Sequence, residues 1–78
     1  MSRVNQVIKL DNGNSYVILK QAIYKNDNYY IASKLDLNNN PIAEELSFFR
    51  EFTLDNDLKL EEITDIELMN YLYSYMKI

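Results

Sequence analysis

Carboxylates gather in one short segment of the chain, and their spacing is the first feature that could support chemistry. Between positions 55 and 67 they are opposed only by Lys59, and they are Asp55, Asp57, Glu61, Glu62, Asp65 and Glu67. A calcium-binding EF-hand loop that began at Asp55 would need glycine at its sixth position and glutamate at its twelfth. The chain carries Leu60 and Ile66 there, so the spacing excludes this kind of metal site.

The chain lacks the side chains that most enzymes use at neutral pH. It contains no histidine, no cysteine and a single glycine. It therefore offers neither the usual general base nor a thiolate nucleophile or metal ligand, and one glycine cannot build a phosphate-binding loop. Paired carboxylates can hydrolyse glycosides within a cleft, but a small sheet with one helix offers little concavity. We expect a protein that is not an enzyme and that uses no metal or cofactor.

Two interpretations of the acidic segment remain open. Negative charge at the start of a helix is favourable because the helix dipole is positive there, and this explains the segment without a partner. Alternatively, the segment docks on a basic partner, as an acidic inhibitor or a mimic of nucleic acid would, through Asp57, Glu61, Glu62 and Asp65. The first 39 residues carry a charge balance of +2 and the last 39 a balance of −6, which together give the net charge of −4. Such asymmetry bears on the choice of partner rather than on the fold.

Tyrosine and lysine alternate in the amino-terminal half of the chain. In the register argued below, one sheet face carries Lys9, Tyr16, Ile18, Lys20, Tyr24, Tyr30 and Lys34. The face is explained by cross-strand pairs of aromatic rings beside solvated lysines, by a protein-binding or self-association surface rich in tyrosine, or by a platform for single-stranded nucleic acid. The acidic net charge and the presence of only two arginines argue against nucleic acid. The candidate partner-binding residues of this face are Tyr16, Lys20, Tyr24, Tyr30 and Lys34.

Turn residues predict how the strands are paired. Asn12-Gly13 is a strong signal for a two-residue hairpin turn, which pairs Ile8 with Val17. In the next turn a one-residue change of register would reverse both faces of the strand. A two-residue loop at Asn26-Asp27 would place Lys34 opposite Leu19 on the apolar face. We therefore predict a three-residue loop over 25–27 with a bulge.

The second half of the chain predicts one long strand and a helix. Apolar residues alternate with other residues from 46 to 54, although Arg50 interrupts the apolar face and should lie near an edge or reach an acidic neighbour. Leu58-Lys59-Leu60 adds a short extended piece. Thr64 and Glu67 have the spacing of a capping box, so the helix is predicted to begin at Thr64. Ile63 and Leu68 form the matching hydrophobic staple. The predicted apolar face of the helix comprises Met69, Leu72, Tyr73 and Met76.

The chain resembles the YrzB-like family of small bacterial proteins. The resemblance rests on Ile8-Lys9-Leu10-Asp11-Asn12-Gly13-Asn14, on Tyr16-Val17-Ile18-Leu19, on the hairpin from Tyr24 to Ala32, on the aromatic strand around Phe48 and on the acidic stretch that contains Asp65. It covers most of the chain. A departure is Asn26-Asp27-Asn28, where the family commonly carries a glycine. The family is one of unknown function, so the resemblance implies the fold and no activity.

Together these patterns predict an α+β protein with a single domain at residues 1–78. Its architecture is an antiparallel four-stranded β-meander with one C-terminal α-helix packed on one sheet face. The first residues carry no apolar signal segment and no run approaches ~20 apolar residues, so we expect a cytoplasmic protein with no membrane partner. We predict a protein-interaction module of unknown pathway, in the specific form of a homodimer joined through the Tyr/Lys face, with the acidic inhibitor as the alternative.

Overall fold

Short turns that contain residues with positive φ connect consecutive strands of the sheet. The computed structural model describes residues 3–76, and five antiparallel strands follow one another in the sheet in the order of the chain. The elements are β1 (Val7–Lys9), β2 (Ser15–Tyr24), β3 (Asp27–Leu35), β4 (Pro41–Leu54), β5 (Asp57–Glu62) and α1 (Ile66–Met76). The α+β class and the C-terminal helix are as predicted. The prediction of four strands is wrong, because the sheet has five.

The fifth strand exists because the turn before it is tight. Asp55 and Asn56 have φ values of 52° and 67°, which is the conformation that a two-residue hairpin turn of type I′ requires. The chain therefore reverses at once, and β5 pairs with β4 from Leu54–Asp57 to Phe49–Glu62. The segment that the sequence indicated as a short extended piece is thus a full edge strand.

The first hairpin differs from its prediction by one residue. Ile8 pairs with Tyr16 rather than with Val17, because the loop holds three residues. Gly13 ends this loop with φ of 90° and donates its N–H to the carbonyl oxygen of Leu10 over 3.0 Å. The shift moves Ile8 and Leu10 to the sheet face that carries Tyr16.

The second hairpin also departs from its predicted loop. Lys25 and Asn26 form a two-residue turn with φ values of 50° and 69°, so the three-residue loop over 25–27 is wrong. The register changes instead at a bulge between Ile18 and Lys20. Beyond the bulge Lys34 pairs with Tyr16. The bulge thus prevents the pairing of Lys34 with Leu19, which the three-residue loop was predicted to prevent.

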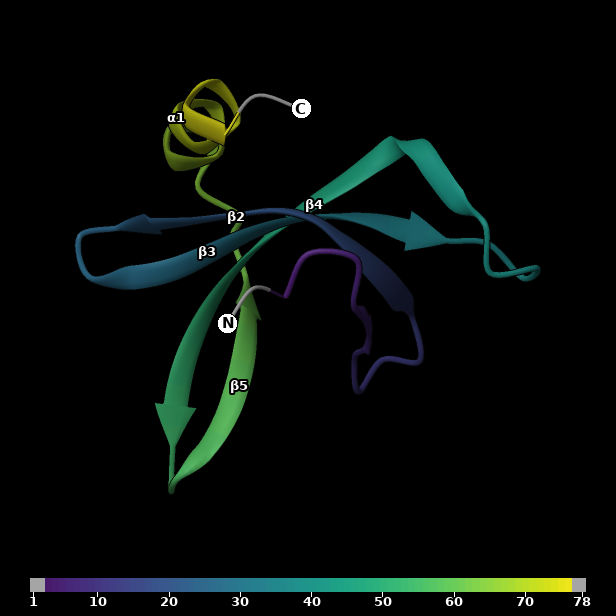
Figure 1. The fold of residues 1–78 in the computed structure, drawn as a ribbon, viewed down its shortest axis with the longest axis horizontal. Coiled ribbons are helices and arrows are strands. Elements are labelled where there is room, and N and C mark those ends of the chain that lie inside the picture. Colours follow the sequence, from purple (N-terminus) through teal and green to yellow (C-terminus); the bar gives the residue numbers. More distant parts are fainter. Residues whose placement is uncertain (1–2, 77–78) are drawn as a thin grey trace.

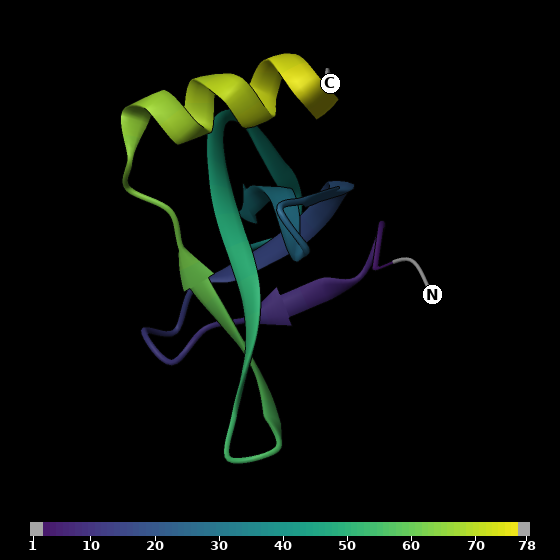
Figure 2. The same cartoon turned by 90° about the vertical axis from the view of Figure 1, so that its left-hand side faces the viewer.

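Both faces of the sheet carry a core, because the sheet curls around one face and α1 covers the other. In Figure 1, β4 bends from the upper right to the bottom of the molecule, and α1 lies on the opposite side from the β4–β5 turn. The inner cluster, on the concave side, comprises Tyr16, Ile18, Tyr30, Ala32 and Phe49, with Ile8, Leu10 and Leu60 packed against it. The helix cluster, beneath α1, comprises Tyr29, Ile31, Phe48 and Leu72, with Tyr24, Leu46, Ile63, Leu68, Met69 and Met76 packed against it. Figure 2 shows α1 lying across the top of the sheet.

The helix cap lies one residue later than the sequence predicted. The backbone N–H of Leu68 donates to Oδ1 of Asp65 over 3.2 Å, so Asp65 is the N-cap and the Thr64–Glu67 capping box is not formed. Asp caps a helix at least as well as Thr and adds negative charge beside the positive end of the dipole. Leu72 is fully buried as predicted, but Tyr73 is 48% exposed and does not belong to the packed face. No helix within residues 3–76 is long and apolar enough to cross a membrane.

Candidate functional site

The predicted Tyr/Lys face is not a surface. Tyr16 is 5% exposed and Tyr30 is 1% exposed, so the prediction that both tyrosines are available to a partner is wrong. The cause is the curl of the sheet, which turns this face inward, where Ile8 and Leu60 pack over it. Tyr16 meets Phe49 edge-on, with ring centroids 5.3 Å apart.

The other three candidates of that face are dispersed. Lys20 follows the bulge and pairs with Ile31 of the helix cluster, so its exposed side chain emerges on the side that α1 covers. Tyr24 lies on the same side and packs against the helix cluster. Lys34 is half-buried beside Tyr16. The bulge reverses the faces of β2 after Ile18, so the five candidates do not lie on one face. No residue type in the sequence predicts this bulge.

A carboxylate that the sequence did not single out lies at the rim of the inner cluster. The side chain of Glu51 is 15% exposed. Its Oε1 accepts a hydrogen bond of 2.6 Å from the hydroxyl of Tyr30 and one of 2.9 Å from Nε of Arg3, and its Oε2 accepts one of 3.2 Å from Nδ2 of Asn28. The backbone N–H of Arg3 donates to Oε1 of Gln21 over 2.9 Å. Glu51 therefore ties the start of the chain to β3 and β4.

These contacts shift the pKa values of two groups. Burial, and then the hydrogen bond to Glu51, raise the pKa of Tyr30 from 10.0 to about 12. Burial also acts to raise the pKa of Glu51, but the hydrogen bonds from Tyr30, Asn28 and Arg3 outweigh it and lower that pKa below 4.5. With this pKa the Tyr30 phenol stays protonated at neutral pH and cannot accept a proton as a phenolate would. The Glu51 carboxylate already accepts three hydrogen bonds. The arrangement is that of a structural tie. The sequence carried no clear signal for this role, because Glu51 lies on the mixed face of the predicted strand, between Phe49 and Thr53.

A row of tyrosine rings joins the β2–β3 hairpin to α1. We call Tyr24, Tyr71 and Tyr75 the tyrosine ladder. The centroids of Tyr24 and Tyr71 are 4.8 Å apart, and Tyr71 stacks on Tyr75 at 6.0 Å with an interplanar angle of 12°. Tyr24 also contacts Tyr29 at 6.1 Å, and Nζ of Lys25 lies 5.3 Å from the Tyr24 ring. The sequence carried a signal for part of this row, because positions 71 and 75 share one face of a helix.

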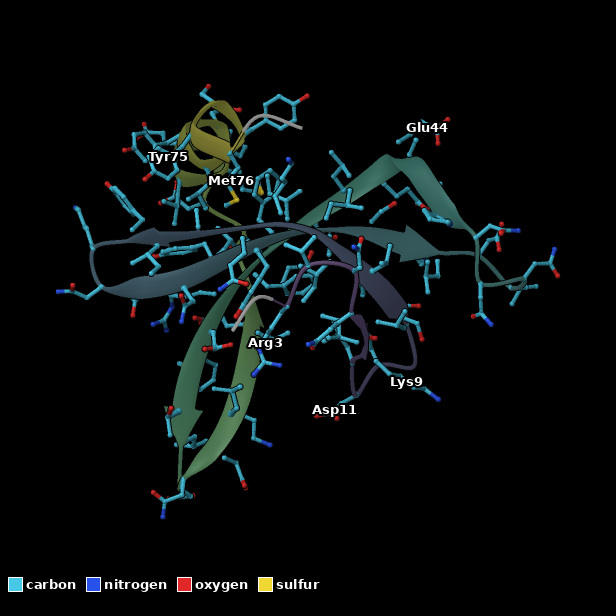
Figure 3. The ribbon with its side chains drawn as sticks, in the orientation of Figure 1. Arg3, Lys9, Asp11, Glu44, Tyr75 and Met76 are labelled. Atoms are coloured by element: carbon cyan, nitrogen blue, oxygen red, sulfur yellow. The ribbon has the colours of Figure 1, made fainter. Side chains whose placement is uncertain are left out.

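The ladder is partly open to solvent. Tyr71 is 46% exposed and Tyr75 is 58% exposed. Figure 3 shows Tyr75 at the side of α1 above the β2–β3 hairpin, whereas Met76 lies below the helix, toward the sheet. The rings of Tyr71 and Tyr75 thus contact each other and remain about half exposed to solvent.

The acidic segment does not form one surface. Oε2 of Glu61 lies 2.9 Å from Nη2 of Arg50, which also reaches Asp27 at 3.8 Å through Nη1. The prediction that Arg50 meets an acidic neighbour is thereby confirmed. Glu62 follows Glu61 in the strand and therefore faces the opposite side of the sheet.

The remaining acidic candidates are placed apart from this pair. Asp65 caps α1, and Asp57 lies at the far end of β5, exposed beside the β4–β5 turn. Within residues 3–76 no group of three or more acidic side chains is placed to hold a metal ion.

A groove of about 570 Å³ separates the β1–β2 hairpin from β5, and its walls include Arg3, Ile8, Leu10, Leu58 and Leu60. It opens on the same concave side as the inner cluster.

No family model, curated protein or solved structure matches this chain. The resemblance to the YrzB-like family stays a prediction, and the function is argued from the geometry.

Proposed function

We propose that this protein is a non-enzymatic interaction module that binds a protein partner through the tyrosine ladder. The observation that supports this function is the row of contacting, partly exposed rings of Tyr24, Tyr71 and Tyr75 beside Lys25. Tyrosine is enriched at protein interfaces because one end of its side chain is apolar and the other can form hydrogen bonds. The cytoplasmic location predicted from the sequence remains part of this proposal.

Preorganisation makes the ladder better suited to binding than scattered tyrosines would be. Immobilising a flexible side chain on binding costs about 0.5–1.5 kcal/mol. Tyr71 is held between Tyr24 and Tyr75 before any partner arrives, so less of this cost remains to be met. Lys25 adds a cation at one end of the row, which favours a partner that combines apolar and acidic side chains there.

Two tyrosines on one helix provide a matched test. The variant Tyr75→Ala removes an exposed ring of the ladder, whereas Tyr73→Ala removes a comparably exposed ring that makes no contact with the ladder rings. Wild type and both variants are immobilised and used to capture proteins quantitatively from an extract of the native host, with nuclease added. The partner identified in this way is then titrated by calorimetry.

We expect the partner to be retained by wild type and by Tyr73→Ala, and to bind at least tenfold more weakly to Tyr75→Ala. Equal binding by both variants would overturn the proposal. Binding that is unaffected by Tyr75→Ala but lost in Asp57→Asn with Glu62→Gln would instead identify the acidic segment as the docking surface. Steep weakening of that binding with salt would support the same conclusion.

A further inference from the structure

One edge of β5 has backbone groups that face no strand within residues 3–76. β5 is the last strand of the sheet and pairs only with β4. The N–H of Ile63 donates to the carbonyl oxygen of Phe48 over 2.8 Å, and this pair continues the β4–β5 register by one step. Because hydrogen-bonded and non-hydrogen-bonded pairs alternate in an antiparallel ladder, Asp57, Lys59 and Glu61 bond to β4. The N–H and C=O groups of Leu58, Leu60 and Glu62 therefore point to the free edge.

Space is available beside this edge. The groove of about 570 Å³ runs along Leu58, Lys59 and Leu60, and Leu58 is 48% exposed. Figure 1 shows the β4–β5 hairpin extending away from α1, so the helix does not cover it. Proteins commonly protect such an edge with a bulge, a proline or charged side chains. β5 contains neither a register shift nor proline, so the charges at positions 57, 59, 61 and 62 decide whether a second strand can pair there.

Symmetry restricts how a second copy could add to the edge. A two-fold axis perpendicular to the sheet keeps each face on its own side, so paired residues must differ by an even number of positions. Hydrogen bonding further requires that the pairs come from Leu58, Leu60 and Glu62. Pairing Leu60 with Leu60, and Leu58 with Glu62, uses the free groups of all three residues. Centring the pair on Lys59 instead leaves Glu62 beyond the partner strand. Centring the pair on Glu61 leaves Leu58 beyond the partner strand and places Glu61 opposite itself.

Charge selects among these three registers. In the register centred on Leu60, Lys59 lies opposite Glu61 of the second copy, and symmetry repeats this pair. Both residues occupy non-hydrogen-bonded positions of the new ladder, where side chains lie closest. The register centred on Lys59 would place that lysine opposite itself and Asp57 opposite Glu61. Arg50 bonds to Oε2 of Glu61, and no described residue bonds to its Oε1, so this oxygen can accept from the second copy.

We infer that two copies of this chain associate through antiparallel pairing of their β5 strands, centred on Leu60 and joined by two Lys59–Glu61 ion pairs. The result is one continuous sheet across the dimer. This surface lies apart from the tyrosine ladder, so the inference goes beyond the proposed function and does not depend on it. Loss of dimerisation leaves binding through the ladder unchanged, and the two failures are distinguishable.

Exchanging the two charges tests the ion pairs. Lys59→Glu places two glutamates opposite each other in the dimer, and Glu61→Lys places two lysines opposite each other. Sedimentation velocity at increasing concentration measures the dimer dissociation constant of each protein. We expect each single variant to dimerise at least tenfold more weakly than wild type. An equimolar mixture of the two variants, and the double variant Lys59→Glu/Glu61→Lys, should regain association because opposite charges face each other again.

Lys20→Glu is the matched control, because it makes the same charge change at an exposed lysine outside the groove. It should dimerise as wild type does. Glu61→Lys also removes the partner of Arg50, so circular dichroism establishes that each variant is folded, and the mixture separates lost folding from lost pairing. A monomeric wild type at several hundred micromolar, or a folded mixture that stays monomeric, would overturn the inference.

The absence of cysteine from the chain allows a direct test of the register. In the proposed dimer the two Leu60 Cα atoms are about 5.5 Å apart, as in any hydrogen-bonded antiparallel pair, and this distance suits a disulfide. The two Leu58 Cα atoms would be about 14 Å apart, because the rise of four residues adds to the spacing between the strands. Leu60→Cys should therefore cross-link under mild oxidation and Leu58→Cys should not. Cross-linking of Lys59→Cys in place of Leu60→Cys would overturn the register.

Discussion

The hydroxyl of Tyr30 donates a hydrogen bond of 2.6 Å to Glu51 on the concave side of the sheet. Tyr30 is 1% exposed, so its polar atom needs a partner inside the molecule. Glu51 in turn holds Arg3 at 2.9 Å. Every buried side-chain nitrogen or oxygen atom within residues 3–76 has a hydrogen-bond partner. Removing one member of this group should therefore leave polar atoms of the other members without a partner.

Replacing Glu51 with Gln is expected to lower the free energy of unfolding by about 1–3 kcal/mol at pH 7, because a charged acceptor is lost and donors then face donors. The pKa of Glu51 is lower in the folded chain than the ordinary value of 4.5. Its contribution is therefore fully present above pH 4.5 and is lost as the pH falls through the folded pKa. Urea unfolding between pH 7 and pH 3 should show the difference between wild type and Glu51→Gln shrinking with acid. Glu45→Gln, at an exposed carboxyl of β4, is the control, and an equal effect there would contradict the prediction.

Tyr30 should ionise well above the ordinary range of a tyrosine. Its folded pKa of about 12 lies above the ordinary value of 10.0, so the stability that the neutral phenol contributes is complete below pH 10 and disappears as the pH rises toward 12. Absorbance of tyrosinate near 295 nm follows the titration. Tyr30→Phe should remove the late phase, and a late phase that persists in this variant would assign it to another ring.

The turns show why sequence patterns predicted the elements better than their register. Gly13 and Asn26 mark reversals of the chain in sequence and in structure alike. The bulge between Ile18 and Lys20 has no glycine or proline to announce it, yet it decides which side each later residue occupies. Residue types therefore predict where strands end. A single inserted residue, such as the one in this bulge, decides which side chains lie on which face of the sheet.

The candidate site was predicted less well than the fold, also for a physical reason. Alternation separates a buried face from a solvated one only when one face is solvated. Tyr16 and Tyr30 were predicted to face outward because their neighbours Val17 and Ile31 were predicted to face inward. Both faces are buried, however, because the curl covers one and α1 covers the other. Tyr24 is the one predicted candidate that lies in the tyrosine ladder, and its ladder neighbour Tyr71 comes from a helix whose docking residue types alone could not predict.

Leu72 anchors α1 to the sheet. It is fully buried in the helix cluster, so Leu72→Ala should lower the free energy of unfolding by about 2–5 kcal/mol. A core of this size supplies about 3–5 kcal/mol of net stability, and we therefore expect a chain that is largely unfolded or whose helix is detached. Circular dichroism with urea measures the loss. Tyr73→Ala on the same helix is the control and should change stability by no more than about 0.5 kcal/mol.

The position of the helix cap separates two residues that lie side by side. Asp65 accepts the N–H of Leu68 at 3.2 Å, and its own carbonyl oxygen accepts the N–H of Met69 at 2.9 Å, as an N-cap residue does. Asp65→Ala should lower the free energy of unfolding by about 0.5–2 kcal/mol. Thr64→Ala should change it by no more than about 0.5 kcal/mol, because Thr64 lies on the surface before the cap. Asp65→Asn restores the hydrogen-bond acceptor without the charge, so it should recover most of the loss except for about 0.3–1 kcal/mol from the helix dipole. Thermal unfolding at low ionic strength would resolve the three variants, and a larger loss in Thr64→Ala than in Asp65→Ala would return the cap to the capping box that the sequence predicted.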